Sequence, residues 1–318
     1  MSQPRAGQNV IRVSAIIPVY NGAATVGCAI RSVLAQQFDG LEIIVVDDGS
    51  TDSTPAALEE WGARIRVIRQ PNRGPAAARN NGARTARGEY LAFLDADDAW
   101  LPGKLIAMVP ALDRAQPQAV LAYSRFTQVD SSGREVEEPF FTTDCDHAPS
   151  MNDMLARWWP ILTSTVVMRR DTFEACGGFS EEFRLAGYED PYLWIVARER
   201  GEFVYLPQSL AVYRSEAALD RMKKYVPGFA IFVRLIRQRY GPAGNPLIRE
   251  LTRAQVSSLG YQGLLAMRRG DKRDARRAFM LALRYNPRSL RSAARLLRTF
   301  LPLNLAQALT GRTRSKPA

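Results

Sequence analysis

Short apolar runs alternate with segments of helical periodicity through the first 125 residues of the chain. The runs are rich in branched aliphatic side chains and are bounded by turn residues, which is typical of buried strands. The pattern predicts strands over 13–18, 41–46, 65–68 and 90–94, and helices over 26–34, 54–61 and 75–84. This alternation indicates an α/β fold, with a mainly parallel sheet that carries helices on both faces.

Acidic and turn-forming residues follow three of the predicted strands, at the sheet edge where α/β proteins bind ligands. They are Pro-Val-Tyr-Asn-Gly at 18–22, Asp-Asp-Gly-Ser at 47–50 and Asp-Ala-Asp-Asp at 95–98. Several ionised carboxylates in one place need a cation, and oxygen ligands favour Mg²⁺ or Mn²⁺. A solvated acidic turn that caps the next helix explains residues 95–98 equally well, so both interpretations stay open at this point.

The residue inventory excludes several kinds of site. His147 is the single histidine and the three cysteines are far apart in the sequence, which removes histidine-based zinc clusters and a disulfide framework. No GxGxxG follows the first predicted strand, and no lysine lies in a GxxxxGK[ST] context. A dinucleotide-dependent oxidoreductase and a P-loop NTPase are therefore not expected.

The net charge of +11 is unevenly distributed along the 318 residues. Residues 1–215 hold 21 Lys and Arg against 27 Asp and Glu, whereas residues 216–318 hold 22 against 5. We therefore predict a catalytic domain over 1–215 and a basic helical region over 216–318. The second region suggests an anionic partner, either a membrane surface or nucleic acid, and a solvated helical surface is the alternative.

Two patterns stand out in the basic region. One fits a single tetratricopeptide-like helical hairpin, from the spacing of Gly263, Ala275, Phe279, Ala282 and Pro287. The other predicts a basic amphipathic helix, with Leu290, Ala293, Ala294, Leu297 and Leu301 on one side and Arg291, Arg295 and Arg298 on another. Since the sequence shows no convincing signal peptide or membrane span, we expect a cytoplasmic chain that binds peripherally to the inner face of a membrane.

Six short motifs, in order and spacing, resemble the inverting GT-A glycosyltransferases of family 2 over about residues 12–215. They are PVYN at 18–21, DDGS at 47–50, GPAAARNNG at 74–82, DADD at 95–98, GGF at 177–179 and Glu189-Asp190. The resemblance implies a Rossmann-like GT-A fold. It also implies transfer of a sugar from a nucleoside diphosphate sugar to an acceptor hydroxyl with inversion, in the synthesis of a cell-surface polysaccharide or glycolipid.

The same resemblance implies roles for individual residues on the donor side. The nucleotide pocket would be lined by Pro18, Val19, Tyr20 and Asn21, with Asp48 accepting a hydrogen bond from the base. Arg79 would approach the nucleotide or Asp95, unless it is an ordinary arginine on a helix surface. Asp95 and Asp97 would lie near the ribose and the metal, and the Mg²⁺ or Mn²⁺ ion would be bound by Asp97 or Asp98.

Asp190 is our candidate for the catalytic base, because a single displacement with inversion needs one carboxylate near the acceptor hydroxyl. Its alternative is structural, since an aspartate before Pro191 fits the N-cap of a helix with proline in its first position. The resemblance implies that Glu189 and Gly178 lie on the acceptor side. The acceptor would be a saccharide or a lipid-linked sugar.

One position departs from the family pattern. Family members often carry a histidine where this chain has Glu216, so a role of that position in holding metal or diphosphate is in doubt. Arg214, two residues earlier, is a candidate phosphate contact. Two other functions are weighed beside the transferase: a nucleotidyltransferase that makes activated sugars, and a nucleic-acid-binding or scaffold protein with a degenerate catalytic domain. Nucleic acid is not the expected partner.

Overall fold

The apolar runs of the N-terminal part form the parallel half of an eight-stranded sheet in the computed structural model, which describes residues 10–115, 117–130, 132–136, 147–157, 159–184, 186–214 and 218–300. These strands are β1 (Val13–Val19), β2 (Leu41–Asp47), β3 (Arg66–Arg69) and β4 (Tyr90–Phe93). All seven residues of β1 are buried, because β1 lies between β2 and β4 and helices cover both of its faces. All four strands fall where the sequence predicts them.

The other half of the sheet is mixed. Its strands are β5 (Ala99–Trp100), β6 (Ala119–Val129), β7 (Val166–Arg169) and β8 (Glu202–Arg214), and the full order is β3-β2-β1-β4-β7-β6-β8-β5. β7 runs antiparallel to both neighbours, β6 and β8 are parallel, and β5 is antiparallel to β8. Among the described residues the parallel pairs outnumber the antiparallel ones, so the prediction of a mainly parallel sheet is confirmed.

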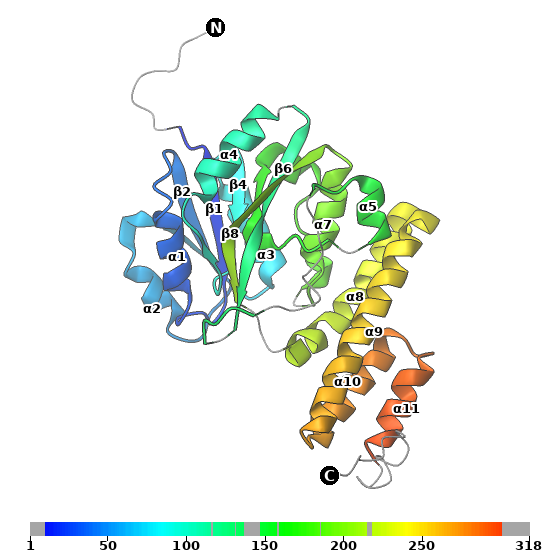
Figure 1. The fold of residues 1–318 in the computed structure, drawn as a ribbon. Coiled ribbons are helices and arrows are strands. Elements are labelled where there is room, and N and C mark those ends of the chain that lie inside the picture. The colour runs from blue at the N-terminus through cyan, green and yellow to red at the C-terminus, as the bar shows by residue number, and fades with distance from the viewer. Residues whose placement is uncertain are drawn as a thin grey trace, which may run out of the picture.

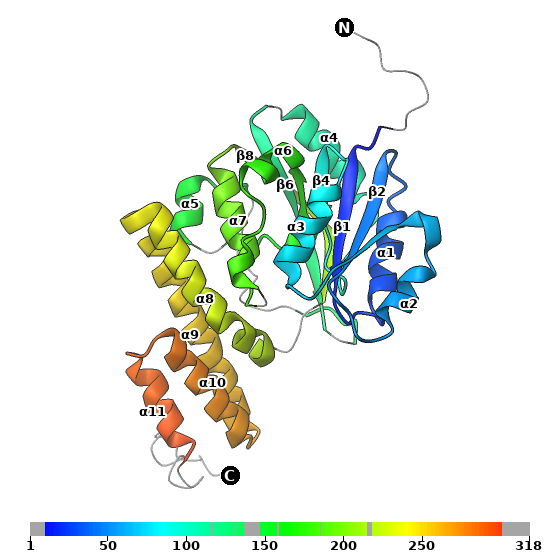
Figure 2. The same cartoon turned by 180° about the vertical axis from the view of Figure 1, so that it is seen from behind.

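Helices cover both faces of this sheet, as the alternation of elements predicts (Figures 1 and 2). Ala15 and Ile17 of β1 belong to one core cluster and Ile16 belongs to the other, because side chains alternate along a strand. The first cluster packs under α1 (Val26–Leu34), α2 (Thr54–Glu59) and α4 (Lys104–Arg114). The second packs under α3 (Pro75–Thr85), α5 (Met151–Ala156), α6 (Arg170–Ala175) and α7 (Glu189–Arg198).

Four helices follow the last strand and extend away from the sheet (Figures 1 and 2). They are α8 (Ala218–Tyr240), α9 (Asn245–Arg268), α10 (Lys272–Tyr285) and α11 (Leu290–Arg298). Phe232 and Ile236 of α8 are fully buried in the same cluster as Trp194 of α7. The basic region therefore packs against the sheet domain through α8, and the predicted boundary at 215–216 stays a prediction.

The predicted hairpin corresponds to α9 and α10, which pack against each other at Gly263. A Cβ placed on Gly263 would lie 2.5 Å from the ring of Phe279, so only glycine lets the two helices approach this closely. Phe279 and Ala275 are fully buried there. The predicted amphipathic helix corresponds to α11, and its last predicted member, Leu301, lies outside the described residues.

Candidate functional site

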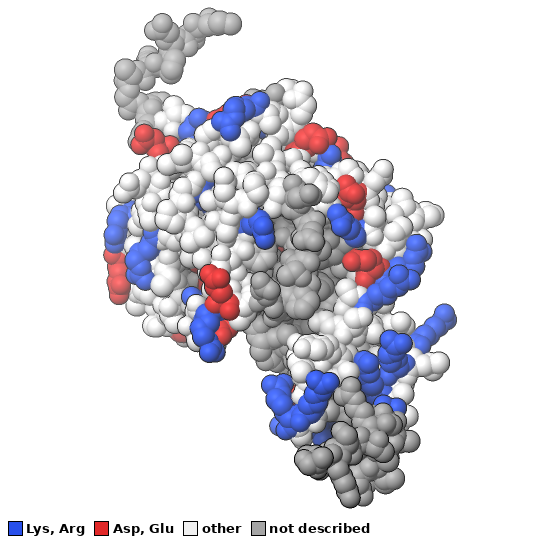
Figure 3. Space-filling model, in the orientation of Figure 1, with Lys and Arg blue, Asp and Glu red and all other residues white. Residues whose placement is uncertain are grey.

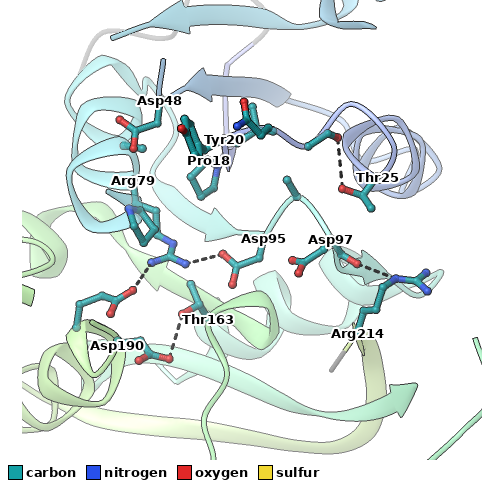
Figure 4. A pocket seen from close by; sticks show the side chains of 18 of the residues that line it. Pro18, Tyr20, Thr25, Asp48, Arg79, Asp95, Asp97, Thr163, Asp190 and Arg214 are labelled. Carbon is teal, nitrogen blue, oxygen red and sulfur yellow. Dashed lines mark hydrogen bonds and ion pairs between the residues drawn. The ribbon is translucent and has the colours of Figure 1, made fainter. Parts of the chain in front are cut away.

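A cavity of about 370 Å³ opens at the edge of the sheet where the parallel strands end (Figure 4). Its wall contains Pro18 and Val19 at the end of β1, Tyr20 and Asn21 after it, Asp48 after β2, Arg79 from α3, Asp95 and Asp97 after β4, and Glu189 and Asp190 from α7. The carboxyl ends of parallel strands meet at one edge, and this explains why segments far apart in the sequence come together. The structure thus brings ten of the predicted site residues to one cavity.

The two loops that follow β1 and β2 are tied together by hydrogen bonds. The Asn21 Oδ1 atom accepts from the backbone N–H of Thr51 at 2.8 Å, and the backbone N–H of Asn21 donates to Ser50 Oγ at 3.0 Å. Gly49 has a φ of 79°, and a Cβ there would lie 2.9 Å from the backbone nitrogen of Asn72. Glycine is therefore required in this turn, which packs directly against the backbone of residues 70–72.

Asp48 is buried and holds the loop that precedes α3. Its Oδ1 accepts from Gln70 Nε2 at 2.8 Å and from the backbone N–H of Arg73 at 2.9 Å, and its Oδ2 accepts from the backbone N–H of Gly74 at 2.8 Å. Asp48 also lines the cavity. Its predicted contact with a nucleotide base stays a prediction, while its role in shaping this wall is visible.

Arg79 joins two carboxylates that lie on different walls of the cavity (Figure 4). Its Nη2 lies 2.6 Å from Asp95 Oδ1, and its Nη1 lies 2.9 Å from Glu189 Oε1. Burial of the guanidinium acts to lower its pKa, but the charges of Asp95 and Glu189 outweigh this and the pKa is raised. The contact with Asp95 agrees with the prediction, and the alternative of a helix-surface arginine is wrong because Arg79 is buried.

Asp190 is the second residue of α7 and lies partly buried in the cavity wall. Burial, reinforced by the negative charge of Glu189, raises its pKa to about 8, although the positive charge of Arg79 acts in the opposite direction. The Oγ1 of Thr163 donates to Asp190 Oδ2 at 3.3 Å. A carboxylate with a pKa near neutrality, next to a cavity, has the properties of a general base.

The helix does not begin where the sequence analysis placed it. Tyr188 is the N-cap of α7, with a left-handed φ of 73°, and its carbonyl oxygen accepts the first helical hydrogen bond from Tyr192. Pro191 is consequently the third helical residue. The structural alternative, in which Asp190 caps the helix and Pro191 is its first residue, is wrong.

The two aspartates expected at a metal ion lie in different environments. Asp97 is exposed and its side chain lies beside that of Asp95 in the cavity wall (Figure 4). Asp98 is buried behind the wall, where its Oδ2 accepts from Ser164 Oγ at 2.5 Å and its Oδ1 from the backbone N–H of Arg214 at 2.9 Å. Burial and the charges of Asp95 and Asp97 raise the pKa of Asp98 well above its usual range. The structure does not bring Asp98 to the cavity.

Asp95 and Asp97 fit a magnesium or manganese ion that shares its coordination with phosphate. No group of three or more His, Cys, Asp or Glu side chains able to hold a metal occurs in the described part of the chain. Mg²⁺ commonly takes one or two carboxylates and completes its shell with substrate phosphates and water. The cavity offers that smaller carboxylate set.

Other predicted and unpredicted residues are placed as follows. Gly178 lies against Asn80 and is not part of the cavity wall. Arg214 lines the cavity and its Nε donates to the backbone oxygen of Asp97 at 3.3 Å, whereas Glu216 lies outside the described residues.

Thr163 lines the cavity but was missed by the sequence analysis. The available signal was the run of three hydroxyl residues at 163–165, which are buried directly before the apolar strand β7.

No helix within the described ranges has both the length and the apolar character needed to cross a membrane.

Comparison with protein families gives a match to the sequence profile of glycosyl transferase family 2 over residues 14–175. An uncharacterized glycosyltransferase of Nostoc is 30% identical over 233 residues, which cover 67% of each chain. The succinoglycan biosynthesis protein ExoO of Rhizobium meliloti is 39% identical over 135 residues, 42% of this chain and 38% of that protein. Against several Rickettsia glycosyltransferases, the chain spans only 18% to 57% of the relative's length.

Solved structures show the same fold at low sequence identity. Residues 1–349 of TarS from S. aureus, in complex with UDP-GlcNAc, superpose with a TM-score of 0.59 and 18% identity, and the match covers 91% of this chain and 89% of that one. The mannosyltransferase PcManGT from Pyrobaculum calidifontis, in complex with GDP-Man and Mn²⁺, superposes with a TM-score of 0.54 and 23% identity over 94% of this chain and 80% of that one.

Proposed function

Since the chain belongs to glycosyltransferase family 2, we propose that it moves a sugar from a nucleoside diphosphate sugar to an acceptor hydroxyl with inversion at the anomeric carbon. The observation that supports this most strongly is the position of Asp190, a partly buried carboxylate that lines the same cavity as residues 18–21, Asp95 and Asp97 and whose pKa is raised to about 8. The family match also favours a glycosyltransferase over a nucleotidyltransferase that makes activated sugars, and over a nucleic-acid-binding protein with a degenerate catalytic domain.

The donor nucleotide would occupy the side of the cavity formed by the loops after β1 and β2. Pro18, Val19, Tyr20 and Asn21 line this side, and the Asp48 side chain holds its outer loop in place. The ring of Tyr20 is half exposed and offers an aromatic face for a base. TarS binding UDP-GlcNAc and PcManGT binding GDP-Man support a nucleoside diphosphate sugar as the donor class.

The diphosphate would lie above Asp95 and Asp97. A Mg²⁺ or Mn²⁺ ion at Asp97 and Asp95 would neutralise the charge that gathers on the leaving diphosphate. The Mn²⁺ complex of PcManGT supports a divalent ion beside the donor. Asp98, with both oxygens hydrogen-bonded to Ser164 and Arg214, would keep the acidic turn in shape instead of binding the ion.

The acceptor hydroxyl would approach from the side of α7. Its oxygen forms the new bond to the anomeric carbon while the bond from that carbon to the diphosphate oxygen breaks, and Asp190 takes the hydroxyl proton. One carboxylate is enough for a single displacement, whereas a retaining double displacement would need a nucleophile as well. Glu189, hydrogen-bonded to Arg79 through Oε1, would orient this wall, and because its second oxygen is buried, contact with the acceptor would require the Glu189 side chain to turn toward the cavity.

The acceptor would be a growing saccharide or a lipid-linked sugar in the synthesis of a surface polysaccharide. The succinoglycan protein of Rhizobium meliloti supports the saccharide class. We place the reaction on the cytoplasmic side of the membrane, where nucleotide sugars are made.

The test compares transfer and donor binding in Asp190→Asn with those in Asp39→Asn, an exposed aspartate outside the cavity. Purified protein is first screened for binding to a panel of nucleoside diphosphate sugars with and without Mn²⁺, and transfer is then followed with the donor that binds. We expect Asp190→Asn to lower turnover by roughly 10²- to 10⁴-fold with nearly unchanged donor affinity, and Asp39→Asn to behave as wild type. Normal turnover in Asp190→Asn would remove it as the base.

A further inference from the structure

The amphipathic helix α11 presents its apolar side to solvent. Leu290 is 84% exposed and Leu297 is 69% exposed, and Ala294 between them is exposed as well. These three positions share one face of a helix because they are four and three residues apart. The opposite face is buried and holds Ser292, which is 2% exposed, and Thr299, which is 0% exposed, beside the partly buried Leu296 that packs against the cluster containing Phe279. A surface helix of a globular protein ordinarily has the reverse orientation.

Polar contacts hold α11 in this orientation. Arg276 of α10 donates to Thr299 twice, from Nε to the side-chain Oγ1 at 3.3 Å and from Nη2 to the backbone oxygen at 3.2 Å. Arg295 lies across α9 at Gly260, where a Cβ would be 2.6 Å from its Nη1. Ser289 caps the helix by accepting from the backbone N–H of Ser292. The exposure of the leucines is thus set by contacts on the buried face.

The exposed apolar stripe, defined as Leu290, Ala294 and Leu297, is surrounded by positive charge. Residues 268–300 contain eleven Lys and Arg and two Asp and Glu. Arg291 and Arg298 lie next to the stripe on the helix surface, because they follow Leu290 and Leu297 by one residue. Figure 3 shows Lys and Arg side chains gathered over the C-terminal helices, with few acidic side chains among them.

We propose that the apolar stripe of α11 and its flanking arginines bind the surface of a bilayer that contains anionic lipids. A lipid interface accepts leucine side chains at the depth of the headgroups and binds arginine through headgroup phosphates at the same time. Duplex nucleic acid would satisfy the arginines but leave both leucines in water. A second copy of this chain would bring two strongly positive surfaces together, and these surfaces would repel each other. A membrane with anionic lipids attracts the same arginines instead.

The proposed lipid-binding role is independent of the transfer reaction, and the stripe is separate from the cavity. The stripe lies on the last described helix, whereas every residue that lines the cavity comes from the sheet domain before residue 215. Binding to lipid and chemistry at Asp190 are therefore separable in experiment. Loss of either one leaves the other measurable.

The experiment is vesicle co-sedimentation of the full chain at low and high salt. The vesicles are made either of phosphatidylcholine alone or of phosphatidylcholine with phosphatidylglycerol. The test variant is Leu290→Glu/Leu297→Glu, and its matched control is Ile106→Glu, which places the same charge on a 61% exposed aliphatic position of α4. A second pair compares Arg291→Gln/Arg298→Gln with Arg114→Gln, an exposed arginine on α4.

We expect the wild-type chain to bind anionic vesicles, to bind neutral ones weakly, and to lose affinity as salt rises. The double leucine variant should bind at least about tenfold more weakly, because two apolar side chains no longer enter the interface. The double arginine variant should weaken binding and reduce its salt dependence, while Ile106→Glu and Arg114→Gln bind as wild type. Transfer to a soluble acceptor should be unchanged in all four.

Three results would overturn the proposal. The first is a full chain that fails to sediment with anionic vesicles at low salt. The second is a double leucine variant that binds them as tightly as wild type, since the stripe would then be irrelevant. The third is sedimentation velocity showing a wild-type dimer that the double leucine variant dissolves, in which case a second copy of the chain covers the stripe.

Discussion

Replacement of Glu189 by glutamine should shift the pH dependence of transfer to lower pH. Asp190 must be ionised to accept the acceptor proton, so the rate at low pH rises with the ionised fraction of this group. With a pKa of about 8, only a minor fraction of Asp190 is ionised at neutral pH. Glutamine keeps the size of Glu189 and the oxygen that accepts from Arg79, but it removes a negative charge that disfavours ionisation of Asp190.

The size of the shift follows from the causes of the raised pKa. Burial is the largest cause and remains in the variant, so the pKa of Asp190 should stay above its ordinary value. Loss of the neighbouring charge should lower it by about one unit, which corresponds to about 1.4 kcal/mol. At pH 7 this raises the ionised fraction roughly fivefold to tenfold relative to wild type.

The assay measures kcat/KM for transfer from pH 5.5 to about 9.5 in wild type, Glu189→Gln and an exposed control, Glu59→Gln. A contact between Glu189 and the acceptor would change the height of the profile, whereas the effect on Asp190 changes the position of its acid limb. We expect the limb to move to lower pH in Glu189→Gln alone. A limb that stays in place, or moves to higher pH, would refute the assignment of Asp190 as the titrating base.

Three further predictions concern metal binding and stability. Asp97→Asn should weaken donor binding and remove its dependence on Mn²⁺ in calorimetry, whereas Asp98→Asn should keep the Mn²⁺ dependence; the reverse result would place the ion at Asp98. Asp190→Asn should stabilise the fold by about 2 kcal/mol at pH 8.5 and by much less at pH 4, because the cost of ionising the wild-type carboxyl in the folded state builds up between its unfolded-state pKa of about 4 and its folded-state pKa of about 8 and is constant above that; urea unfolding at both pH values measures this. Gly263→Ala should destabilise the chain by about 1–3 kcal/mol, since the new Cβ would collide with Phe279, and an unchanged urea midpoint would show that α9 and α10 can separate freely.

Most of the parallel half of the sheet could be predicted from the sequence, because each of its strands forms a local apolar pattern. β1 and β2 read as continuous branched aliphatic runs, and the residues that end them are the ones that line the cavity. Local pattern and tertiary position agree there. The edge of a parallel sheet then predicts which loops meet.

The different environments of the aspartates at 95–98 could not be predicted from the local sequence. In the sequence Asp97 and Asp98 are equivalent neighbours, yet one is exposed at the cavity and the other is buried behind it. The difference comes from Ser164 and Arg214, which are 66 and 116 residues away from Asp98. No local pattern contains that information.

The orientation of α11 could not be predicted from the sequence either. Helical periodicity correctly predicted leucines on one side and arginines on another. It could not tell which side would face α10, because that depends on Arg276 reaching Thr299. The prediction of where α7 begins was wrong for a related reason, since the left-handed conformation of Tyr188 is not typical of a bulky residue.

The hydrogen bond from the backbone of Arg214 to Asp98 also bears on the order in which the protein folds. The parallel strands β1 to β4 are complete once residue 93 has been synthesised, and each of their strand pairs joins segments closer in sequence than Asp98 and Arg214. The acidic turn, by contrast, is fastened by β8, the last strand of the sheet, which pairs with β5 and carries Arg214 at its end. Contacts between such distant segments form slowly compared with local ones. The donor side of the cavity therefore gains its final geometry late, after nearly the whole sheet domain has left the ribosome, and a chain interrupted before residue 202 would lack the strand that fastens the acidic turn.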